Sequence, residues 1–344
     1  MTGPVVGRTA AIFGLEGPTL NPDEAAFFRA ADPFGFILFA RNVDAPDQLR
    51  RLTAGLRACV NRNAPIFIDQ EGGRVQRLRA PHWAEWLPPL DAVARARAKG
   101  GLTAAIRMME LRSRLIAAEL RAVGIDGNCA PCLDLASPVT HPFLLNRCYG
   151  DDPVEVARLG RAVANGHLAG GVLPVMKHIP GHGRAAADTH VDLPTVTEPG
   201  EVLERTDFAA FKALADLPIA MTSHVVYAAF DDLPATLSAV IIRLIRDRIG
   251  FDGLLLTDDL NMKALTGPAP ALAARALQAG CDLALYCRGP VQIMDQLAEQ
   301  VGSMHPDTLR RAQTAIACRT TPDTIDIAAL QAEHSSLLAG KLHV

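Results

Sequence analysis

The stretch Leu173-Pro-Val-Met-Lys-His178 is a short run of mainly apolar residues that ends in two polar side chains, and a loop rich in proline and glycine follows it. A continuous apolar run of this length is typical of a parallel β-strand that is buried on both faces. Seven similar runs occur in the rest of the chain, at Thr9–Leu15, Gly35–Phe39, Pro65–Asp69, Gly127–Leu133, Ile219–Thr222, Leu254–Asp258 and Asp282–Tyr286.

Amphipathic stretches with helical spacing separate these runs. They include Pro46–Val60, Leu102–Val123, Val154–Leu168, Val202–Leu214, Ala239–Ile249 and Ala271–Ala279. Eight strand–helix repeats in 344 residues predict a single (β/α)8 TIM barrel. We expect residues 1–344 to form one domain, with an alanine-rich tail from about residue 320 as a helical extension that packs on the barrel. An open doubly wound sheet is the alternative, but its usual glycine-rich phosphate turn is not seen early in the sequence.

The composition excludes several classes of function. Hydrophobic residues make up 49% of the chain and the net charge is −3, which disfavours binding to nucleic acid or to an anionic membrane surface. No stretch approaches 18 uninterrupted apolar residues, so we expect no membrane-spanning helix. The first residues lack the apolar segment of a secretory signal, and seven scattered cysteines suit a reducing compartment. We therefore expect a cytoplasmic protein.

Two of the cysteines, Cys129 and Cys132, form a C-x-x-C pair. The pair lies in a segment with the pattern of a strand and its exit, and no second pair accompanies it. We interpret these residues as packing cysteines rather than as a redox or zinc site.

Polar residues follow several of the strand-like runs, at the end where a TIM barrel builds its active site. Asp69 ends the third run, and Arg77 follows it after a Gly-Gly pair. This pattern fits the binding of sugar hydroxyls and fits equally an Asp–Arg pair that fixes a loop. Arg147 follows the fourth run and, taken alone, is more typical of an ordinary loop residue.

The fifth run ends in Lys177 and His178, and the loop after it contains His182, Asp188 and His190. A lysine at the end of a buried strand needs partners or a function to offset its desolvation. Asp188 and His190 are two residues apart, so their side chains share one side of an extended loop. The carboxylate could then set the tautomer of the imidazole, leaving the other nitrogen to transfer a proton. A metal site at His178 and His182 is disfavoured, because their four-residue spacing falls on a Pro-Gly turn rather than on a helix.

The seventh run ends in two adjacent carboxylates, Asp258 and Asp259. One of them is a candidate nucleophile. Neighbouring residues on a strand point in opposite directions, so at most one of the two should face the mouth of the barrel. We expect the other to cap a helix or to anchor a loop.

Three segments together resemble the signatures of glycoside hydrolase family 3, and most closely its bacterial β-N-acetylhexosaminidase branch. They are Asp69-Gln-Glu-Gly-Gly-Arg-Val-Gln-Arg77, Lys177-His-Ile-Pro-Gly-His-Gly183 with Asp188-Thr-His190, and Thr257-Asp-Asp-Leu-Asn-Met262. The resemblance extends over nearly the whole chain, from about Gly14 to Leu283. Cys148 and Ile179 depart from the family pattern, which affects only local packing and fine specificity.

The resemblance implies a retaining β-N-acetylglucosaminidase in which Asp258 is the nucleophile and His190, paired with Asp188, is the acid/base. It also implies a set of residues that bind N-acetylglucosamine, namely Asp69, Arg77, Arg147, Lys177 and His178. The implied substrate comes from peptidoglycan recycling: N-acetylglucosamine β-1,4-linked to anhydro-N-acetylmuramic acid, with or without peptide. No metal or other cofactor is implied.

Three alternatives remain open from the residues. Substrate assistance would make the 2-acetamido group the nucleophile, with Asp258 polarising it. A Schiff-base aldolase or lyase would use Lys177 as its imine-forming amine, although this leaves Asp258 and the Asp188–His190 pair without a role. An inactive sugar-binding barrel is the third alternative, and the intact set of polar strand ends argues against it.

Overall fold

The computed structural model describes residues 5–185 and 192–339, and these residues form a closed barrel of eight parallel strands. The order around the barrel is β1 (Thr9–Gly14), β12 (Leu283–Tyr286), β11 (Leu254–Asp259), β9 (Ile219–Thr222), β7 (Leu173–Ile179), β6 (Gly127–Asn128), β3 (Ile66–Ile68) and β2 (Pro33–Leu38). Each apolar run supplies one strand, and β1 pairs with β12 to close the sheet. The predicted TIM barrel is confirmed, and the open sheet is excluded.

The fourth barrel strand is shorter than predicted. We expected it to extend over Gly127–Leu133, but β6 ends at Asn128, because Pro131 has no N–H to donate to a strand ladder. The segment that follows still runs beside β7, where the N–H of Lys177 donates to the carbonyl of Pro131. This path brings Asp134 close to the end of β7.

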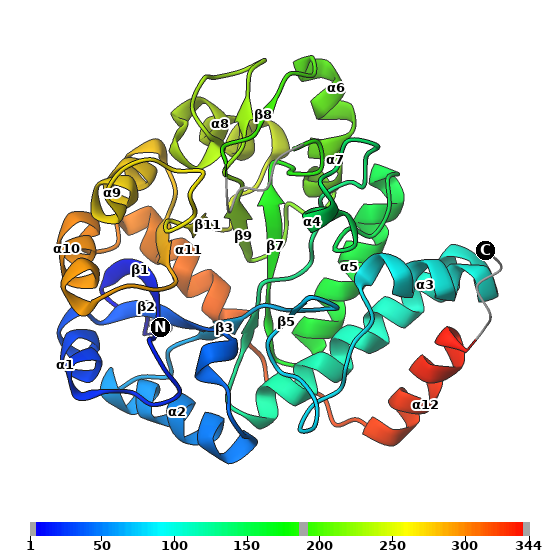
Figure 1. The fold of residues 1–344 in the computed structure, drawn as a ribbon, viewed down its shortest axis with the longest axis horizontal. Coiled ribbons are helices and arrows are strands. Elements are labelled where there is room, and N and C mark those ends of the chain that lie inside the picture. The colour runs from blue at the N-terminus through cyan, green and yellow to red at the C-terminus, as the bar shows by residue number, and fades with distance from the viewer. Residues whose placement is uncertain (1–4, 186–191, 340–344) are drawn as a thin grey trace.

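Helices surround the barrel as a ring (Figure 1). They are α1 (Pro22–Ala31), α2 (Pro46–Cys59), α3 (Pro89–Ala122), α5 (Pro153–Ala169), α6 (Gly200–Arg205), α7 (Asp207–Lys212), α8 (Ala239–Leu244), η3 (Ile245–Ile249), α9 (Ala269–Ala279) and α10 (Val291–Val301). Shorter elements lie in the connections: η1 (Ala40–Asn42), the hairpin of β4 (Gln70–Gly72) and β5 (Val75–Gln76), α4 (Pro142–Leu145), the pair of β8 (Thr195–Val196) and β10 (Val226–Tyr227), and η2 (Ala235–Leu237). No helix in the described part of the chain is both long enough and apolar enough to cross a membrane.

Two expected helices are interrupted. Ala239–Ile249 changes from α8 to the π-helical turn η3 at Ile245. The expected helix Val202–Leu214 is divided at Thr206 into α6 and α7. Arg184 occupies the break: its Nη2 donates to the Thr206 hydroxyl at 3.2 Å and its Nε donates to the Asp207 carboxylate at 2.7 Å. Arg184 belongs to the loop after β7, so the break provides a partly buried ionic anchor for that loop.

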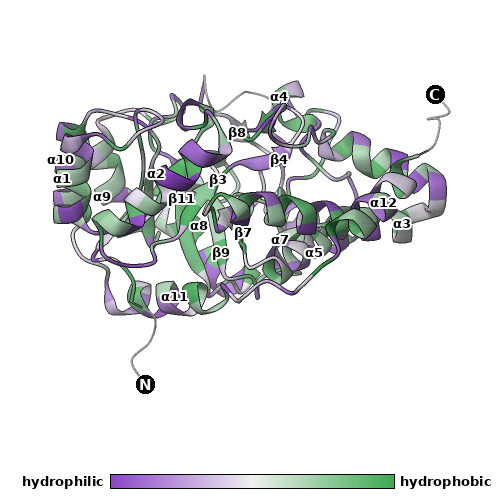
Figure 2. Cartoon of the chain, turned by 90° about the horizontal axis from the view of Figure 1, so that it is seen from below, coloured by the Kyte–Doolittle hydropathy of each residue, from purple (hydrophilic) through white to green (hydrophobic). Residues whose placement is uncertain are grey.

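The two ends of the barrel differ in what covers them. α11 (Pro306–Ala317) closes the end at which the strands begin, where Ala312, Ala315 and Ile316 pack against the barrel interior. Figure 2 shows α11 at the bottom of the molecule and the β4 region and α4 at the top. The last helix, α12 (Ile327–Leu338), packs against α3, with His334 edge-on to Trp86. The end at which the strands finish is left to the connecting loops.

A buried histidine on α5 makes the stability of the fold depend on pH. His167 Nδ1 lies 2.8 Å from the carbonyl oxygen of Val163, and Nε2 lies 2.8 Å from the side-chain nitrogen of Asn128. Burial lowers the pKa of His167 to about 4. Between pH ~6.5 and ~4 the unfolded chain is protonated at this residue and the folded chain is not. The free energy of unfolding should therefore fall with falling pH, by up to about 1.4 kcal/mol per pH unit from this residue.

Urea unfolding at several pH values between these limits measures this effect. We expect His167→Gln to reduce the pH dependence of the unfolding free energy, whereas His82→Gln, at an exposed histidine, should leave it unchanged. An identical pH dependence in the wild type and in His167→Gln would contradict the prediction.

Candidate active site

A pocket of about 310 Å³ lies where the barrel strands end. It is bordered by residues at or just after the ends of β2, β3, β7, β9, β11 and β12 and by residues of the loop that contains α4. Six of the residues predicted from the sequence border it: Asp69, Arg77, Arg147, Lys177, His178 and Asp258. Two further predicted residues, Asp188 and His190, lie outside the described residues.

Lys177, in β7, is buried between two carboxylates. Its Nζ lies 2.9 Å from Asp69 Oδ1 and 2.6 Å from Glu71 Oε1. Burial acts to lower the pKa of Lys177, but the two carboxylates outweigh burial and raise it. The side chain is therefore an ammonium ion. It can donate a hydrogen bond to a sugar hydroxyl, and it is a poor amine nucleophile.

Glu71 is a buried acid that the interpretation of the sequence did not include among the site residues. Its two oxygens accept hydrogen bonds from Arg147 Nε and Nη2, both at 2.9 Å, in a bidentate pair. Burial acts to raise the pKa of Glu71, but Arg147 and Lys177 hold it at about 2. Glu71 thus aligns two cations at once. Its place two residues after Asp69 in the same motif was a usable signal.

Asp69 joins this network to Arg77. Its Oδ2 accepts a hydrogen bond from Arg77 Nη2 at 2.9 Å, while its Oδ1 binds Lys177. Burial acts to raise the pKa of Asp69, but the two cations lower it, so that the carboxylate is ionised. The Asp–Arg pair considered as a structural alternative is present, and the same two residues also border the pocket.

Asp258 and Asp259, at the end of β11, both border the pocket. The pairing of β11 with β12 shifts register between Leu256 and Asp259, which breaks the regular alternation of side chains. Asp259 Oδ1 accepts hydrogen bonds from the backbone N–H groups of Cys287 and Asn261, each at 3.1 Å. Asp259 is therefore a loop anchor, as expected for one member of the pair.

The electrostatic surroundings of the two carboxylates differ. Burial raises the pKa of Asp259. Burial acts in the same direction on Asp258, but the imidazoles of His178 and His224 and the N–H of Asp259 outweigh it and lower the pKa of Asp258. Asp258 is thus the more readily ionised of the two, as a nucleophile must be.

His178 joins the pocket to a fully buried acid, Asp134. His178 Nδ1 lies 2.6 Å from Asp134 Oδ2, and His178 Nε2 lies 3.4 Å from Arg147 Nη2. Asp134 also accepts the N–H of His182 at 2.7 Å. His182 borders the pocket, its ring Nδ1 has no hydrogen-bond partner among the described residues, and burial lowers its pKa to about 4. Asp134 was not singled out from the sequence, because no local pattern connects it to β7.

Comparison with known proteins shows which family this chain belongs to. Residues 22–317 match the model of the glycosyl hydrolase family 3 N-terminal domain. The chain belongs to glycoside hydrolase family 3. Within this family, the β-hexosaminidase of Alkalilimnicola ehrlichii is 37% identical over 292 residues, which cover 81% of this chain and 80% of the relative. The β-hexosaminidase of Methylococcus capsulatus is 37% identical over 308 residues, covering 87% and 89%.

Solved structures of the family agree. NagZ from Neisseria gonorrhoeae, in complex with N-trifluoroacetyl-D-glucosamine, has a TM-score of 0.86 and 30% identity, and the match covers 98% of this chain and 100% of that one. A family 3 β-N-acetylglucosaminidase from Paenibacillus has a TM-score of 0.79 and 30% identity, covering 97% of this chain and 63% of that one. The resemblance seen in the sequence is confirmed, and the protein is a glycoside hydrolase of the β-hexosaminidase type.

Proposed function

We propose that this enzyme is a retaining β-N-acetylglucosaminidase that removes terminal β-linked N-acetylglucosamine from anhydro-muropeptides in peptidoglycan recycling. The observation that carries the proposal is the pocket, which brings Asp69, Arg77, Lys177 and His178 together with the ionised Asp258. N. gonorrhoeae NagZ, which shares the fold, was solved with an N-acetylglucosamine analogue. A pocket of about 310 Å³ is at the small end of ligand sites, which suits one sugar ring and favours action at a chain end.

The charged network supplies the hydrogen bonds that a sugar needs. Lys177 and Arg77 are donors, the Asp69 carboxylate is an acceptor, and each is held by a charged neighbour before any ligand arrives. Groups that are already oriented lose little entropy when substrate binds. We propose that they hold the hydroxyls of N-acetylglucosamine, together with Arg147 and His178.

We propose a double displacement. Asp258 attacks the anomeric carbon and forms a glycosyl ester as the glycosidic C–O bond breaks, and His190 donates a proton to the leaving oxygen. His190 then accepts a proton from the water that hydrolyses the ester, and two inversions restore the β configuration. Asp188 would orient the imidazole. The roles of Asp188 and His190 rest on their spacing and on the family motif, whereas that of Asp258 is also supported by its lowered pKa.

The Schiff-base alternative is disfavoured by the surroundings of Lys177. Two carboxylates within 3 Å keep its amine protonated, and an ammonium ion has no lone pair with which to attack a carbonyl group. Substrate assistance is weighed by the experiment below.

We also propose that the enzyme acts in the cytoplasm. Buried thiols such as Cys129 and Cys132, which burial keeps protonated by raising their pKa, are compatible with a reducing compartment, where recycled anhydro-muropeptides would be processed. Activity that fractionates with the periplasm would contradict this location.

The proposed function is tested with three substrates and one trap. In the presence of EDTA, the enzyme should release nitrophenol from the β-anomer of 4-nitrophenyl N-acetylglucosaminide but not from the α-anomer, and it should cleave N-acetylglucosaminyl-anhydro-N-acetylmuramic acid. A 2-fluoro glycosyl donor, which lacks the acetamido group, should label the peptide that contains Asp258. Hydrolysis with no adduct, together with tight binding of a thiazoline analogue, would favour substrate assistance. No hydrolysis of either β-linked substrate would reject the proposal.

A further inference from the structure

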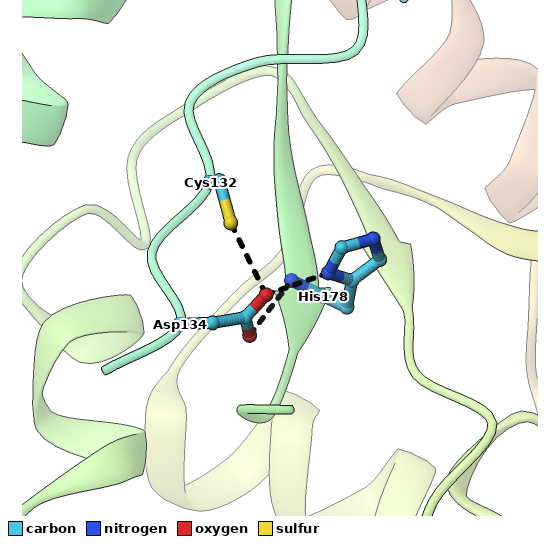
Figure 3. A group of neighbouring side chains, drawn as sticks. All are labelled: Cys132, Asp134 and His178. Atoms are coloured by element: carbon cyan, nitrogen blue, oxygen red, sulfur yellow. Dashed lines mark hydrogen bonds and ion pairs between the residues drawn. The ribbon is translucent and has the colours of Figure 1, made fainter. Parts of the chain in front are cut away.

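Cys132, Asp134 and His178 form a buried cluster beside the pocket (Figure 3). Within the described ranges, it is the one group of three cysteine, histidine or acidic side chains close enough to share a metal ion. The distances are those of direct hydrogen bonds, however: 2.6 Å from His178 Nδ1 and 3.2 Å from Cys132 Sγ to the same Asp134 oxygen. Burial also raises the pKa of the Cys132 thiol well above its usual value, which opposes metal ligation. The cluster is better explained by hydrogen bonding.

We infer that Asp134 is a positioning residue that holds the ring proton of His178 on Nδ1 and so presents Nε2 to the pocket as a hydrogen-bond acceptor for a sugar hydroxyl. This inference rests on the proposed function. It gives His178 a defined chemical role in binding. Nε2 accepts a hydrogen bond from a sugar hydroxyl, whereas the neighbouring Lys177 can only donate one.

The partners of Asp134 show that it is an anion. Its side chain is fully buried, and it accepts hydrogen bonds from the His178 ring, from the Cys132 thiol and from the backbone N–H groups of His178 and His182. Burial acts to raise the pKa of Asp134, but His178 and His182 outweigh it and lower the pKa. A carboxylate has no proton to give, so the proton in the 2.6 Å contact belongs to His178 Nδ1.

The other side of the His178 ring agrees with this tautomer. Nε2 lies 3.4 Å from Arg147 Nη2, and a guanidinium group can only donate. In the neutral ring with its proton on Nδ1, the single lone pair of Nε2 accepts this long N–H contact, and a bound sugar hydroxyl would take the place of Arg147 as its donor. In the opposite tautomer, Nε2–H would point at another N–H, and Nδ1 would present its lone pair to the Asp134 anion. Both neighbours therefore favour the same tautomer.

A double-mutant cycle tests whether Asp134 acts through His178. In Asp134→Asn the side chain keeps its size but can turn an NH2 group toward Nδ1, so we expect kcat/KM to fall by roughly 10–100-fold. His178→Ala should lower kcat/KM by at least as much. The double variant should be no worse than His178→Ala alone, because the residue that Asp134 positions is already gone. If the loss of kcat/KM in the double variant equals the product of the losses in the two single variants, then Asp134 acts independently of His178, and the inference is overturned.

A matched control removes a comparable carboxylate at the opposite end of the barrel. Asp282 is also buried; it accepts hydrogen bonds from the Leu255 N–H and the Thr308 hydroxyl, and it pairs with Arg246 and Arg311. Asp282→Asn should lower the thermal stability and leave kcat/KM within about twofold of the wild type. A loss of kcat/KM in this control as large as that in Asp134→Asn would show that any buried charge removal has the same result and would overturn the inference.

A measurement on the wild type keeps the inference testable if Asp134→Asn does not fold. In protein labelled with 15N-histidine, the signals of His178, identified by their loss in His178→Ala, should show a protonated Nδ1 and an unprotonated Nε2 in the neutral form of the ring. The reverse pattern would overturn the inference. Absence of hydrolytic activity in the wild type would instead reject the proposed function, while the tautomer would still be read from the spectrum.

Discussion

Asp258→Asn should lower kcat by at least about 10³-fold on 4-nitrophenyl N-acetyl-β-D-glucosaminide. An amide is too weak a nucleophile to form the glycosyl ester, and the loss of its negative charge also removes stabilisation of the positively charged transition state. Asp258 faces the imidazoles of His178 and His224 and accepts the N–H of Asp259, an environment that favours the carboxylate. Because an asparagine can still accept the Asp259 N–H, we expect the fold and the binding of free N-acetylglucosamine to be retained.

Asp259→Asn is the matched control for this prediction. The Asp259 side chain accepts two backbone N–H groups, and an asparagine oxygen can accept the same two. We therefore expect a loss of less than about tenfold in kcat. Steady-state kinetics of the two variants, with thermal denaturation to check folding, measure the contrast. A large loss in Asp259→Asn with normal turnover in Asp258→Asn would show that Asp259, and not Asp258, is the nucleophile.

Removal of the nucleophile also allows a chemical rescue. In Asp258→Ala, sodium azide should fit the space left by the carboxylate, attack the anomeric carbon and displace the leaving group in one step. The expected product is the α-glycosyl azide, because azide attacks the anomeric carbon from the face that Asp258 occupied and inverts its configuration once. A β-glycosyl azide would mean that another group, such as the acetamido oxygen, makes the first attack.

Glu71→Gln, a change that conserves size beside the pocket, should lower both the stability and the activity. Glu71 is 2% exposed at its side chain and neutralises Arg147 and Lys177 together. A glutamine would leave at least one buried cation without its partner, which typically costs roughly 3–5 kcal/mol. Misalignment of Lys177 and Arg147 should also reduce kcat/KM, by about 10²-fold. Urea unfolding and kinetics measure these two effects separately.

The control for Glu71→Gln is Glu119→Gln. The carboxylate of Glu119 accepts hydrogen bonds from the Ala84 N–H and the Trp86 indole N–H, and a glutamine oxygen can replace part of this pattern without stranding a cation. We expect a stability loss below about 1 kcal/mol and unchanged kinetics. If Glu71→Gln loses stability with kcat/KM unchanged, then Glu71 supports the fold but does not align the sugar-binding cations.

The barrel was predictable because each of its strands carries a local signal. A buried parallel strand must be apolar on both faces, and eight such runs separated by helical patterns leave few arrangements other than a closed barrel. The exceptions were also local in origin but harder to see. Pro131 ends β6 early, and Thr206, which accepts a hydrogen bond from Arg184, interrupts an expected helix.

The candidate site was predictable only in part. Asp69, Lys177 and Asp258 stand at strand ends, where position in the barrel already indicates a functional face, and the family motif adds their expected roles. Glu71 has only the weaker signal of its place two residues after Asp69, and Asp134 has no local signal at all. Glu71 meets Arg147 across 76 positions of the chain, and Asp134 meets His178 across 44. Such pairings arise from strand order and loop paths, which no spacing rule in the sequence reports.

The local pattern of apolar and polar residues is thus enough to predict the barrel and the row of polar groups at its open end, because both follow from short-range periodicity and from strand direction. The charge state and orientation of those groups are properties of the folded pocket. Burial acts to neutralise Asp258, Glu71 and Lys177 alike, and only the neighbours that folding brings within 3 to 4 Å keep Lys177 an ammonium ion and Glu71 a carboxylate. The difference between the pKa values of Asp258 and Asp259, adjacent in the sequence, has the same origin: the imidazoles near Asp258 outweigh its burial, whereas the N–H groups that Asp259 accepts do not outweigh its burial.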